Sequence, residues 1–289
     1  MRVLFRLLSL LPLRVLHALG GLAGWLVYLA SPTYRRHLRE NMALALGEPL
    51  AASARAEAIA SAGRMVFELP KIWLHPLDRA VAMIREVRGW EHVEAARAAG
   101  KGIVFLTPHL GCFEITAQYY AAHAPIAVLY RPPRYAVVQE MIEAGRARPM
   151  LHLAPADLSG VRSLIKSLKK GEAVGMLPDQ APKVGEGKWL PFFGRNAYTM
   201  TLAARLTETG ATVLMAFGER LPGGAGFRLH FRPPLAPIDG DLDTRARAVN
   251  REIEALVREY PGQYLWGYNR YKRPRGVEAP PADTAPRES

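Results

Sequence analysis

Short apolar runs alternate with helical patterns over the larger, second part of the chain. Four of these runs are short and continuous, as buried strands are: Ile103–Leu106, Ile126–Tyr130, Ala173–Leu177 and Thr212–Phe217. Helical patterns separate them near residues 112–122, 134–145, 158–170 and 199–209, and a last one covers about 244–260. This alternation predicts an α/β fold, with a mainly parallel sheet flanked by helices.

The first thirty residues form an apolar segment that arginines interrupt. Its longest stretch without Lys, Arg, Asp or Glu runs from Val15 to Tyr34, and its strongly apolar part is shorter. A spanning helix needs roughly 20 apolar residues, so the segment fits a short span, a helix lying in the membrane interface, or an amphipathic core helix. No small-residue cleavage site follows it, which argues against a removed signal peptide. The basic patch Arg35, Arg36, His37 and Arg39 would face a cytoplasmic leaflet.

The helical patterns and breaks divide the chain into four parts. Residues 1–30 are predicted to be the membrane anchor or interfacial helix. Residues 31–84 form a helical segment, with one helix ending at Leu46 and an alanine-rich helix over 52–75 that is kinked at Pro70. Residues 85–275 form the α/β domain. The tail 276–289, rich in Pro, Ala and charge, is expected to be disordered.

Composition narrows the class of partner. The 289 residues are 49% hydrophobic, enough to bury a core, and carry a formal net charge of +12. Such a charge indicates a polyanionic partner: nucleic acid, an anionic membrane surface, or an acidic protein or substrate. The single cysteine, Cys112, excludes internal disulfides and a cysteine-rich zinc site, and the eight histidines lack ligand spacing. We therefore expect neither a metal nor a cofactor.

The segment from Gly102 to Glu114 carries the candidate chemistry. Its strand ends at Thr107-Pro108, so His109 would lie on a turn at the carboxyl end of the strand, where open α/β sheets bind ligands. Glu114 would hold the imidazole from the first turn of the next helix, and the imidazole would take a proton from an attacking hydroxyl. Backbone N–H groups at the helix start would receive the oxyanion. A histidine at a strand end is also often only hydrogen-bonded structure.

These residues resemble a known signature. His109-x4-Glu114 after an apolar strand is similar to the His-x4-Asp/Glu element of glycerolipid acyltransferases, and the whole chain resembles the lipid A biosynthesis acyltransferases (the late lauroyl and myristoyl transferases). Further landmarks match in order over nearly residues 1–275: Tyr130-Arg131-Pro132, Gly145-Arg146, the lysine-rich helix from Leu158 to Gly171, Pro178-Asp179-Gln180, Pro191-Phe-Phe-Gly194, Pro261-Gly-Gln-Tyr-Leu-Trp266, and the Tyr268 and Arg270 that follow.

The resemblance implies a membrane-bound O-acyltransferase on the cytoplasmic face of the inner membrane, with an acyl carrier protein thioester as donor and a glycolipid acceptor. It implies a catalytic pair of His109 and Glu114, and substrate-binding roles for Arg131, Arg146, Asp179 and Gln180. The Leu-Gly-Cys-Phe interior of the signature and the Pro133–Tyr135 segment depart from some family members. The acceptor therefore stays open between a lipid A precursor and another lipid: a phosphatidylinositol mannoside, an aminolipid or a lysophospholipid.

Several of these residues have a second interpretation. Arg131 and Arg146 are either solvated or anion contacts, and Asp179 either caps a turn or pairs with Arg146 or His152. Cys112 is either a thiol nucleophile or packing. Trp189, Phe192 and Phe193 are either pocket or core aromatics. Candidate contacts for the acidic carrier protein are Arg131, Arg134, Arg148, Lys166, Lys169, Lys170 and the cluster Arg270, Lys272 and Arg273; the three lysines also fit a solvated helix face.

Two other classes of protein fit parts of the sequence. A basic nucleic-acid-binding protein explains the charge, but it leaves the apolar N-terminus unexplained, and no nucleic-acid motif of the usual kinds is present, so we expect no nucleic-acid partner. An inactive scaffold at the membrane surface would be expected to lack the His109/Glu114 pair, which this chain retains.

Overall fold

A mixed sheet forms the centre of the computed structural model, which describes residues 2–133 and 136–281. Within this described part the sheet has seven strands in the order β1-β9-β8-β2-β5-β3-β4. Neighbouring strands run parallel except for β8 and β9. The strands are β1 Ile84–Arg88, β2 Ile103–Leu106, β3 Ile126–Tyr130, β4 Leu151–Pro155, β5 Ala173–Met176, β8 Thr212–Arg220 and β9 Phe227–Arg232. The predicted mainly parallel α/β fold is confirmed.

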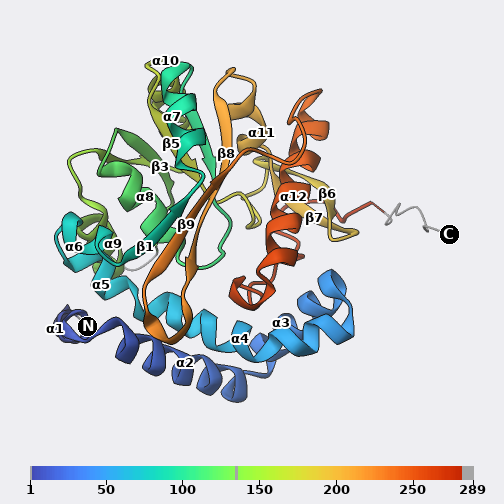
Figure 1. Ribbon diagram of the computed structural model, residues 1–289. Coiled ribbons are helices and arrows are strands. Elements are labelled where there is room, and N and C mark those ends of the chain that lie inside the picture. Colours follow the sequence, from blue (N-terminus) through green and yellow to red (C-terminus); the bar gives the residue numbers. More distant parts are fainter. Residues whose placement is uncertain (1, 134–135, 282–289) are drawn as a thin grey trace.

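Helices cover both faces of the sheet (Figure 1). Because successive strand residues point to opposite faces, β2 contributes to two cores. Val104 and Leu106 belong to the cluster under α10 Leu158–Lys169, α11 Leu202–Thr207 and α12 Leu242–Glu259. Ile103 and Phe105 belong to the cluster under α7 Trp90–Ala98 and α8 Phe113–Ala121. The strand that leads to His109 is thus buried on both sides.

The N-terminal helices gather at one end of the sheet (Figure 1). They are α1 Arg2–Leu10, α2 Leu13–Ala30, α3 Pro32–Leu46, α4 Glu48–Phe67, α5 Leu69–Leu74 and α6 Leu77–Val81. Of these, α1 and α2 lie outermost, and α4 lies between α2 and the sheet. Side chains of α3 and α4, among them Leu38, Met42 and Ile59, are buried in the same core as the sheet. Among the described residues, α2 is the one helix long and apolar enough to cross a membrane by length and composition, with a mean hydropathy of 1.4 and 33% of its residues buried.

The helix that the sequence predicts over residues 52–75 is two helices. α4 ends at Phe67, and Pro70 lies in the first turn of α5, where a missing N–H costs little. The predicted strands agree with β2, β3, β5 and β8, but the structure adds β1, β4, β9 and a hairpin of β6 Gly187–Phe192 with β7 Arg195–Met200. Short 3₁₀ turns cover Pro222–Gly224 and Pro261–Gln263, and α9 covers Ala136–Arg146. The boundaries at residues 30, 84 and 275 remain predictions, and residues 282–289 of the tail lie outside the described part.

Candidate active site

The turn that carries His109 begins where β2 ends and is fixed by backbone hydrogen bonds. Gly111 N donates to Gln263 O at 3.0 Å and Cys112 N to Gly218 O at 2.7 Å. Gly111 has a φ of +57°, and a Cβ at this position would lie 2.0 Å from Gly218 O. Only glycine fits such an approach, so the turn holds His109 on a rigid support.

The backbone amides of this turn already have acceptors in this conformation. The N–H groups of residues 109–112 donate to Asp179 Oδ2, Pro108 O, Gln263 O and Gly218 O respectively. The amides expected to receive an oxyanion would therefore have to come from the first turn of α8, from Phe113 onward, or from a side chain.

Asp179 is the carboxylate that orients His109. Its Oδ1 lies 2.8 Å from His109 Nδ1, and its Oδ2 accepts the backbone N–H of His109 at 3.0 Å. The residue follows β5, which pairs with β2 in parallel, so both strands deliver their last residues to the same edge of the sheet. Burial alone would raise the pKa of Asp179, but the adjacent His109 and the hydrogen bonds it donates lower it below its ordinary value. Asp179 is thus an anion beside the imidazole.

This pairing sets the tautomer of the imidazole. Because Nδ1 carries the proton that Asp179 accepts, Nε2 is the acceptor, and Gln180 Nε2 lies 3.1 Å from it. His109 retains a side-chain exposure of 17%, against 2% for Asp179. The imidazole therefore presents an acceptor nitrogen to the Gln180 amide and a protonated nitrogen to a buried carboxylate, the arrangement that a general base needs.

Glu114 does not orient His109 in this structure, and the predicted contact between them is corrected. Its carboxylate pairs with Arg146, which donates from Nε at 3.0 Å and also from Nη2, and it accepts the Trp73 indole N–H at 3.0 Å. Glu114 is only the second residue of α8, and there its side chain lies toward α5 and α9. Of the two interpretations left open for Asp179, the pairing with Arg146 or His152 is wrong, because its carboxylate binds His109.

An apolar cavity lies under α8, between the Glu114–Arg146 pair and the sheet. Its walls include Phe105, Tyr120, Ile126, Val128 and Phe231, and Phe113 at its wall lies 5.0 Å from the His109 ring. The volume is about 30 Å³, room for roughly two water-sized groups. An acyl chain could enter it only if side chains on the walls move apart.

The remaining predicted substrate contact lies near the same edge. Arg131 follows β3, is exposed, and pairs with Glu186 at 3.3 Å. Lys183 is also exposed, and its backbone N–H donates to the same carboxylate. The structure therefore brings His109, Asp179 and Gln180 into direct contact, holds Glu114 and Arg146 as a second pair, and leaves Arg131 at the surface.

The comparison with known proteins identifies the family of the chain. A family model described as bacterial lipid A biosynthesis acyltransferase matches residues 2–273. The chain belongs to this family. It is therefore an acyltransferase, as the sequence predicted.

Several known lipid acyltransferases match most of the length of this lipid A acyltransferase family member. The chain is 31% identical to the lipid A biosynthesis lauroyltransferase of Escherichia coli (strain K12), over 75% of this chain and 71% of the relative. It is 28% identical to the palmitoleoyltransferase of the same organism, over 92% and 88%. It is also 25% identical to the phosphatidylinositol mannoside acyltransferase of Mycobacterium tuberculosis, over 84% of each chain.

Several other residues that the sequence suggested for catalysis or binding have structural roles in this acyltransferase. Cys112 is buried beside Glu68 and Arg220, and burial together with Glu68 raises the pKa of its thiol well above the ordinary value, which disfavours a thiolate nucleophile. Arg148 donates to Gln118 and to three backbone carbonyls of residues 72–75. Phe192, Phe193 and Arg270 are buried, and Arg134 lies outside the described residues. Among the described residues, no group of His, Cys, Asp and Glu could hold a metal ion.

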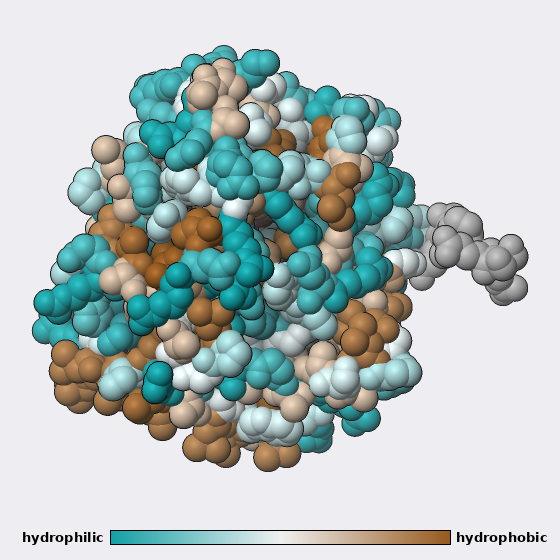
Figure 2. Space-filling view, viewed as in Figure 1, coloured by the Kyte–Doolittle hydropathy of each residue, from teal (hydrophilic) through white to brown (hydrophobic). Residues whose placement is uncertain are grey.

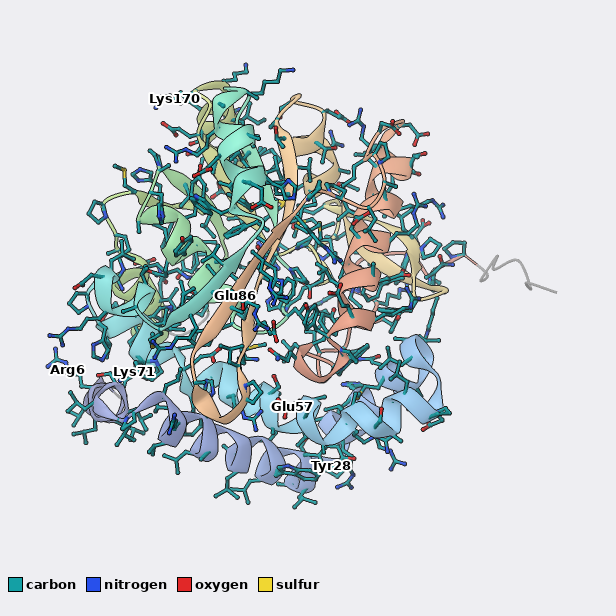
Figure 3. The ribbon with its side chains drawn as sticks, viewed as in Figure 1. Arg6, Tyr28, Glu57, Lys71, Glu86 and Lys170 are labelled. Atoms are coloured by element: carbon teal, nitrogen blue, oxygen red, sulfur yellow. The ribbon has the colours of Figure 1, made fainter. Side chains whose placement is uncertain are left out.

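The lysine-bearing end of helix α10 lies at the opposite edge of the sheet from His109. Its last residues, Lys169 and Lys170, lead into the amino end of β5, whereas His109 follows the carboxyl end of the parallel strand β2. Lys170 accordingly lies at the pole opposite the N-terminal helices (Figure 3). A carrier protein bound to these lysines would be separated from His109 by the length of the sheet.

Sequence reasoning missed two residues that support the site. Trp73 on α5 donates to Glu114. The hydroxyl of Tyr264 hydrogen-bonds Asp179, and burial together with the charge of Asp179 raises the pKa of this phenol well above its ordinary value. Tyr264 could have been recognised from the sequence, because it lies in the family landmark Pro261–Trp266. Trp73 comes from a helix that is joined to the site only by tertiary packing.

Proposed function

We propose that this enzyme transfers a fatty acyl group from an acyl carrier protein thioester to a hydroxyl of a membrane glycolipid, a lipid A precursor, on the cytoplasmic face of the inner membrane. The observation that carries the proposal is the His109 imidazole, held by the buried Asp179 with Nε2 as its acceptor nitrogen and an apolar cavity beside it. Family membership supports acyl transfer, and the lipid A names of the relatives support the acceptor.

His109 acts as the general base. Its Nε2 takes the proton of the acceptor hydroxyl while the oxygen attacks the thioester carbonyl carbon. Asp179 stabilises the imidazolium that forms, because it already accepts the Nδ1 proton. When the tetrahedral intermediate collapses, the carbon–sulfur bond breaks, the imidazolium returns the proton to the leaving thiolate, and the ester and free thiol result.

Gln180 is the candidate donor to the oxyanion. Its amide nitrogen lies 3.1 Å from His109 Nε2, so an incoming hydroxyl must take its place at the imidazole. Once displaced, the amide is beside the reacting carbonyl and free to donate to its oxygen. The backbone amides at 109–112 are committed elsewhere, which supports a side-chain donor.

Glu114 and Arg146 contribute as a pair that forms one wall of the apolar cavity. Both residues lie on the cavity wall and hold each other through two hydrogen bonds. Burial would lower the pKa of Arg146, but the charge of Glu114 raises it above its ordinary value, so the guanidinium stays charged. When the side chains on its walls move apart, the cavity accepts the donor's acyl chain, and the pair aligns the thioester or an anionic group of the acceptor at its mouth.

The donor docks at the edge of the sheet that carries His109. A net charge of +12 attracts an acidic carrier protein. Arg131 and Lys183 are exposed near this edge, whereas Lys166 and Lys169 belong to the helix that ends at the opposite edge. Of the candidate carrier-protein contacts, we therefore keep Arg131, add Lys183, and set the lysine helix aside.

The test compares two donors, an acyl carrier protein thioester and a coenzyme A thioester, at low and raised salt, with the lipid product identified by mass spectrometry. If the acidic face of the carrier protein steers binding, the reaction rate with that donor should fall more steeply with added salt than the rate with the coenzyme A donor. The double variant Arg131→Glu/Lys183→Glu should slow the carrier-protein reaction selectively, and Lys166→Glu/Lys169→Glu is the matched control. Equal rates and equal salt sensitivity for both donors would refute the carrier-protein assignment while leaving acyl transfer intact.

A second acceptor class has one specific observation in its favour. The chain matches a phosphatidylinositol mannoside acyltransferase over 84% of its length. The same assay therefore includes a phosphatidylinositol mannoside beside the lipid A precursor, and faster transfer to the mannoside would reassign the acceptor.

A further inference from the structure

The helices α1 and α2 present a continuous apolar face to the outside of the molecule. Its members are among the large apolar side chains of both helices that are 39–74% exposed: Val3, Leu4, Leu7, Leu10, Val15, Leu19, Leu22, Leu26 and Leu29, with Trp25 and Val27 exposed beside them. On α2 they recur at spacings of three and four residues, which is one face of a helix. Figure 2 shows these hydrophobic residues gathered along the lower edge of the molecule, where α1 and α2 lie in Figure 1.

The other face of α2 is packed along its length on α4. A Cβ at Gly24 would lie 2.2 Å from Ile59 O, and one at Gly63 would lie 1.9 Å from Gly20 O, so the two helix backbones are in contact. Near the amino end of α2, His17 Nε2 lies 3.1 Å from the buried carboxylate of Glu68. The helix is thus part of the folded protein and runs beside α4.

This packing is incompatible with a helix that crosses the bilayer. α4 carries Glu57 and Arg64, whose side chains form an ion pair, and Glu68 follows its end. If α2 stood across the membrane, its partner α4 would be carried into the hydrocarbon together with these charges, which is energetically costly. Figure 3 shows Arg6 and Tyr28 at opposite ends of one row of helices that runs along the edge of the protein.

We propose that α1 and α2 lie flat in one leaflet of a membrane, with their apolar face in the hydrocarbon and α4 above them. Arg6 and Arg14 on these helices, and Arg36 and Arg39 on α3, are exposed and suit anionic headgroups. Lys71 donates to Ser9 O and Leu11 O and so fixes the bend between α1 and α2. The partner is a lipid surface, and the protein is bound to one side of it.

This orientation places the active site close to the membrane surface. Arg220 donates to both oxygens of Glu68 at 2.8 Å and to Gly111 O at 2.6 Å, and Glu68 is also the partner of His17. These buried side chains connect the membrane helix to the turn of His109. Deletion of residues 1–30 would remove a helix that is packed on α4, so the depth of α2 in the membrane must be tested in the full chain.

The depth of α2 in lipid distinguishes the two orientations. Single cysteines replace Val15, Leu19, Leu22, Leu26 and Leu29 in turn, and each carries a nitroxide; the buried Cys112 leaves the parent protein as the unlabelled control. The protein is bound to vesicles of phosphatidylethanolamine with a minority of phosphatidylglycerol. A flat helix gives depths within about 5 Å of one another, whereas a crossing helix puts position 22 roughly 10 Å deeper than positions 15 and 29, at 1.5 Å per residue. The second profile would overturn the proposal.

Binding to the same vesicles provides the second test. Leu22→Lys/Leu26→Lys should weaken vesicle co-sedimentation by at least about tenfold, because two exposed leucines leave the hydrocarbon. Leu235→Lys, at a leucine 71% exposed on a distant loop, is the matched control and should bind as the parent does. Unchanged binding of the double variant contradicts the proposal, as does a dimer that buries this face and stays dissociated from vesicles. Neither test measures catalysis, so the outcome is independent of the proposed reaction.

Discussion

Replacing Asp179 by asparagine tests how the base is oriented, because the change keeps the shape of the side chain and removes one acceptor. Asp179 accepts two hydrogen bonds from His109, one from the backbone N–H and one from Nδ1–H. Asparagine has one oxygen and one NH₂ group, so it can satisfy only one of these donors. The backbone N–H is always a donor, whereas the imidazole can carry its proton on either ring nitrogen. The amide oxygen of the introduced asparagine should therefore accept the backbone N–H, and its NH₂ group should face Nδ1.

The imidazole of Asp179→Asn then carries its proton on Nε2 and cannot accept the proton of the acceptor hydroxyl. Loss of a correctly oriented base costs about 10²–10⁴-fold in kcat. The assay is steady-state transfer from the carrier-protein thioester, with circular dichroism and thermal unfolding to verify the fold. Asp243→Asn, at an exposed aspartate paired with Lys188, is the matched control and should keep full activity.

The reasoning fails if folded Asp179→Asn keeps its kcat within about tenfold. It also fails if Glu114→Gln produces the base-type loss while Asp179→Asn does not, since that result would restore the pairing of Glu114 with His109 that the sequence predicted.

Three further changes probe the rest of the site. Arg146→Lys keeps the charge but loses the two-pronged contact with Glu114, and kcat/KM should fall about 10–100-fold; full activity would show that a point charge suffices. Gly175→Val would fill the apolar cavity, because a Cβ at this position meets its first neighbours at 3.5 and 3.6 Å. When donors of different length compete, the variant should prefer shorter acyl chains. An unchanged preference would show that the cavity does not bind the acyl chain. Because the folded pKa of Asp179 lies below the ordinary 3.8, the stability it contributes is present above that value and is lost as pH falls through the folded pKa. The difference in free energy of unfolding between the parent and Asp179→Asn should therefore shrink below about pH 4, and a constant difference would be inconsistent with a charged Asp179 whose pKa is lowered by folding.

The sequence predicted the centre of the fold well, because the central strands are buried on both faces and appear as continuous apolar runs. The strands β1 and β4 were missed, since polar residues interrupt both; β9 alternates apolar and polar residues strictly and could have been recognised. The β6–β7 hairpin also had a signal, because its turn is Phe193-Gly194 with φ values of 48° and 74°.

The members of the site were predictable, but their pairing was not. Landmarks along the chain named His109, Asp179 and Gln180, yet which carboxylate meets the imidazole depends on the order of strands in the sheet. That order places β5 beside β2 although about seventy residues separate their ends. Glu114, only five residues from His109, is directed away because its helix presents it to Trp73 and Arg146. Spacing along the chain describes proximity of the backbone, not direction of the side chain.

The central claim is that His109 is the general base of acyl transfer to a lipid hydroxyl. The most direct measurement is the turnover of purified, folded His109→Ala with the carrier-protein donor and a lipid A precursor, with the acylated lipid quantified by mass spectrometry. The account predicts a loss of about two to four orders of magnitude, with vesicle binding unchanged. Turnover close to that of the parent enzyme would contradict it.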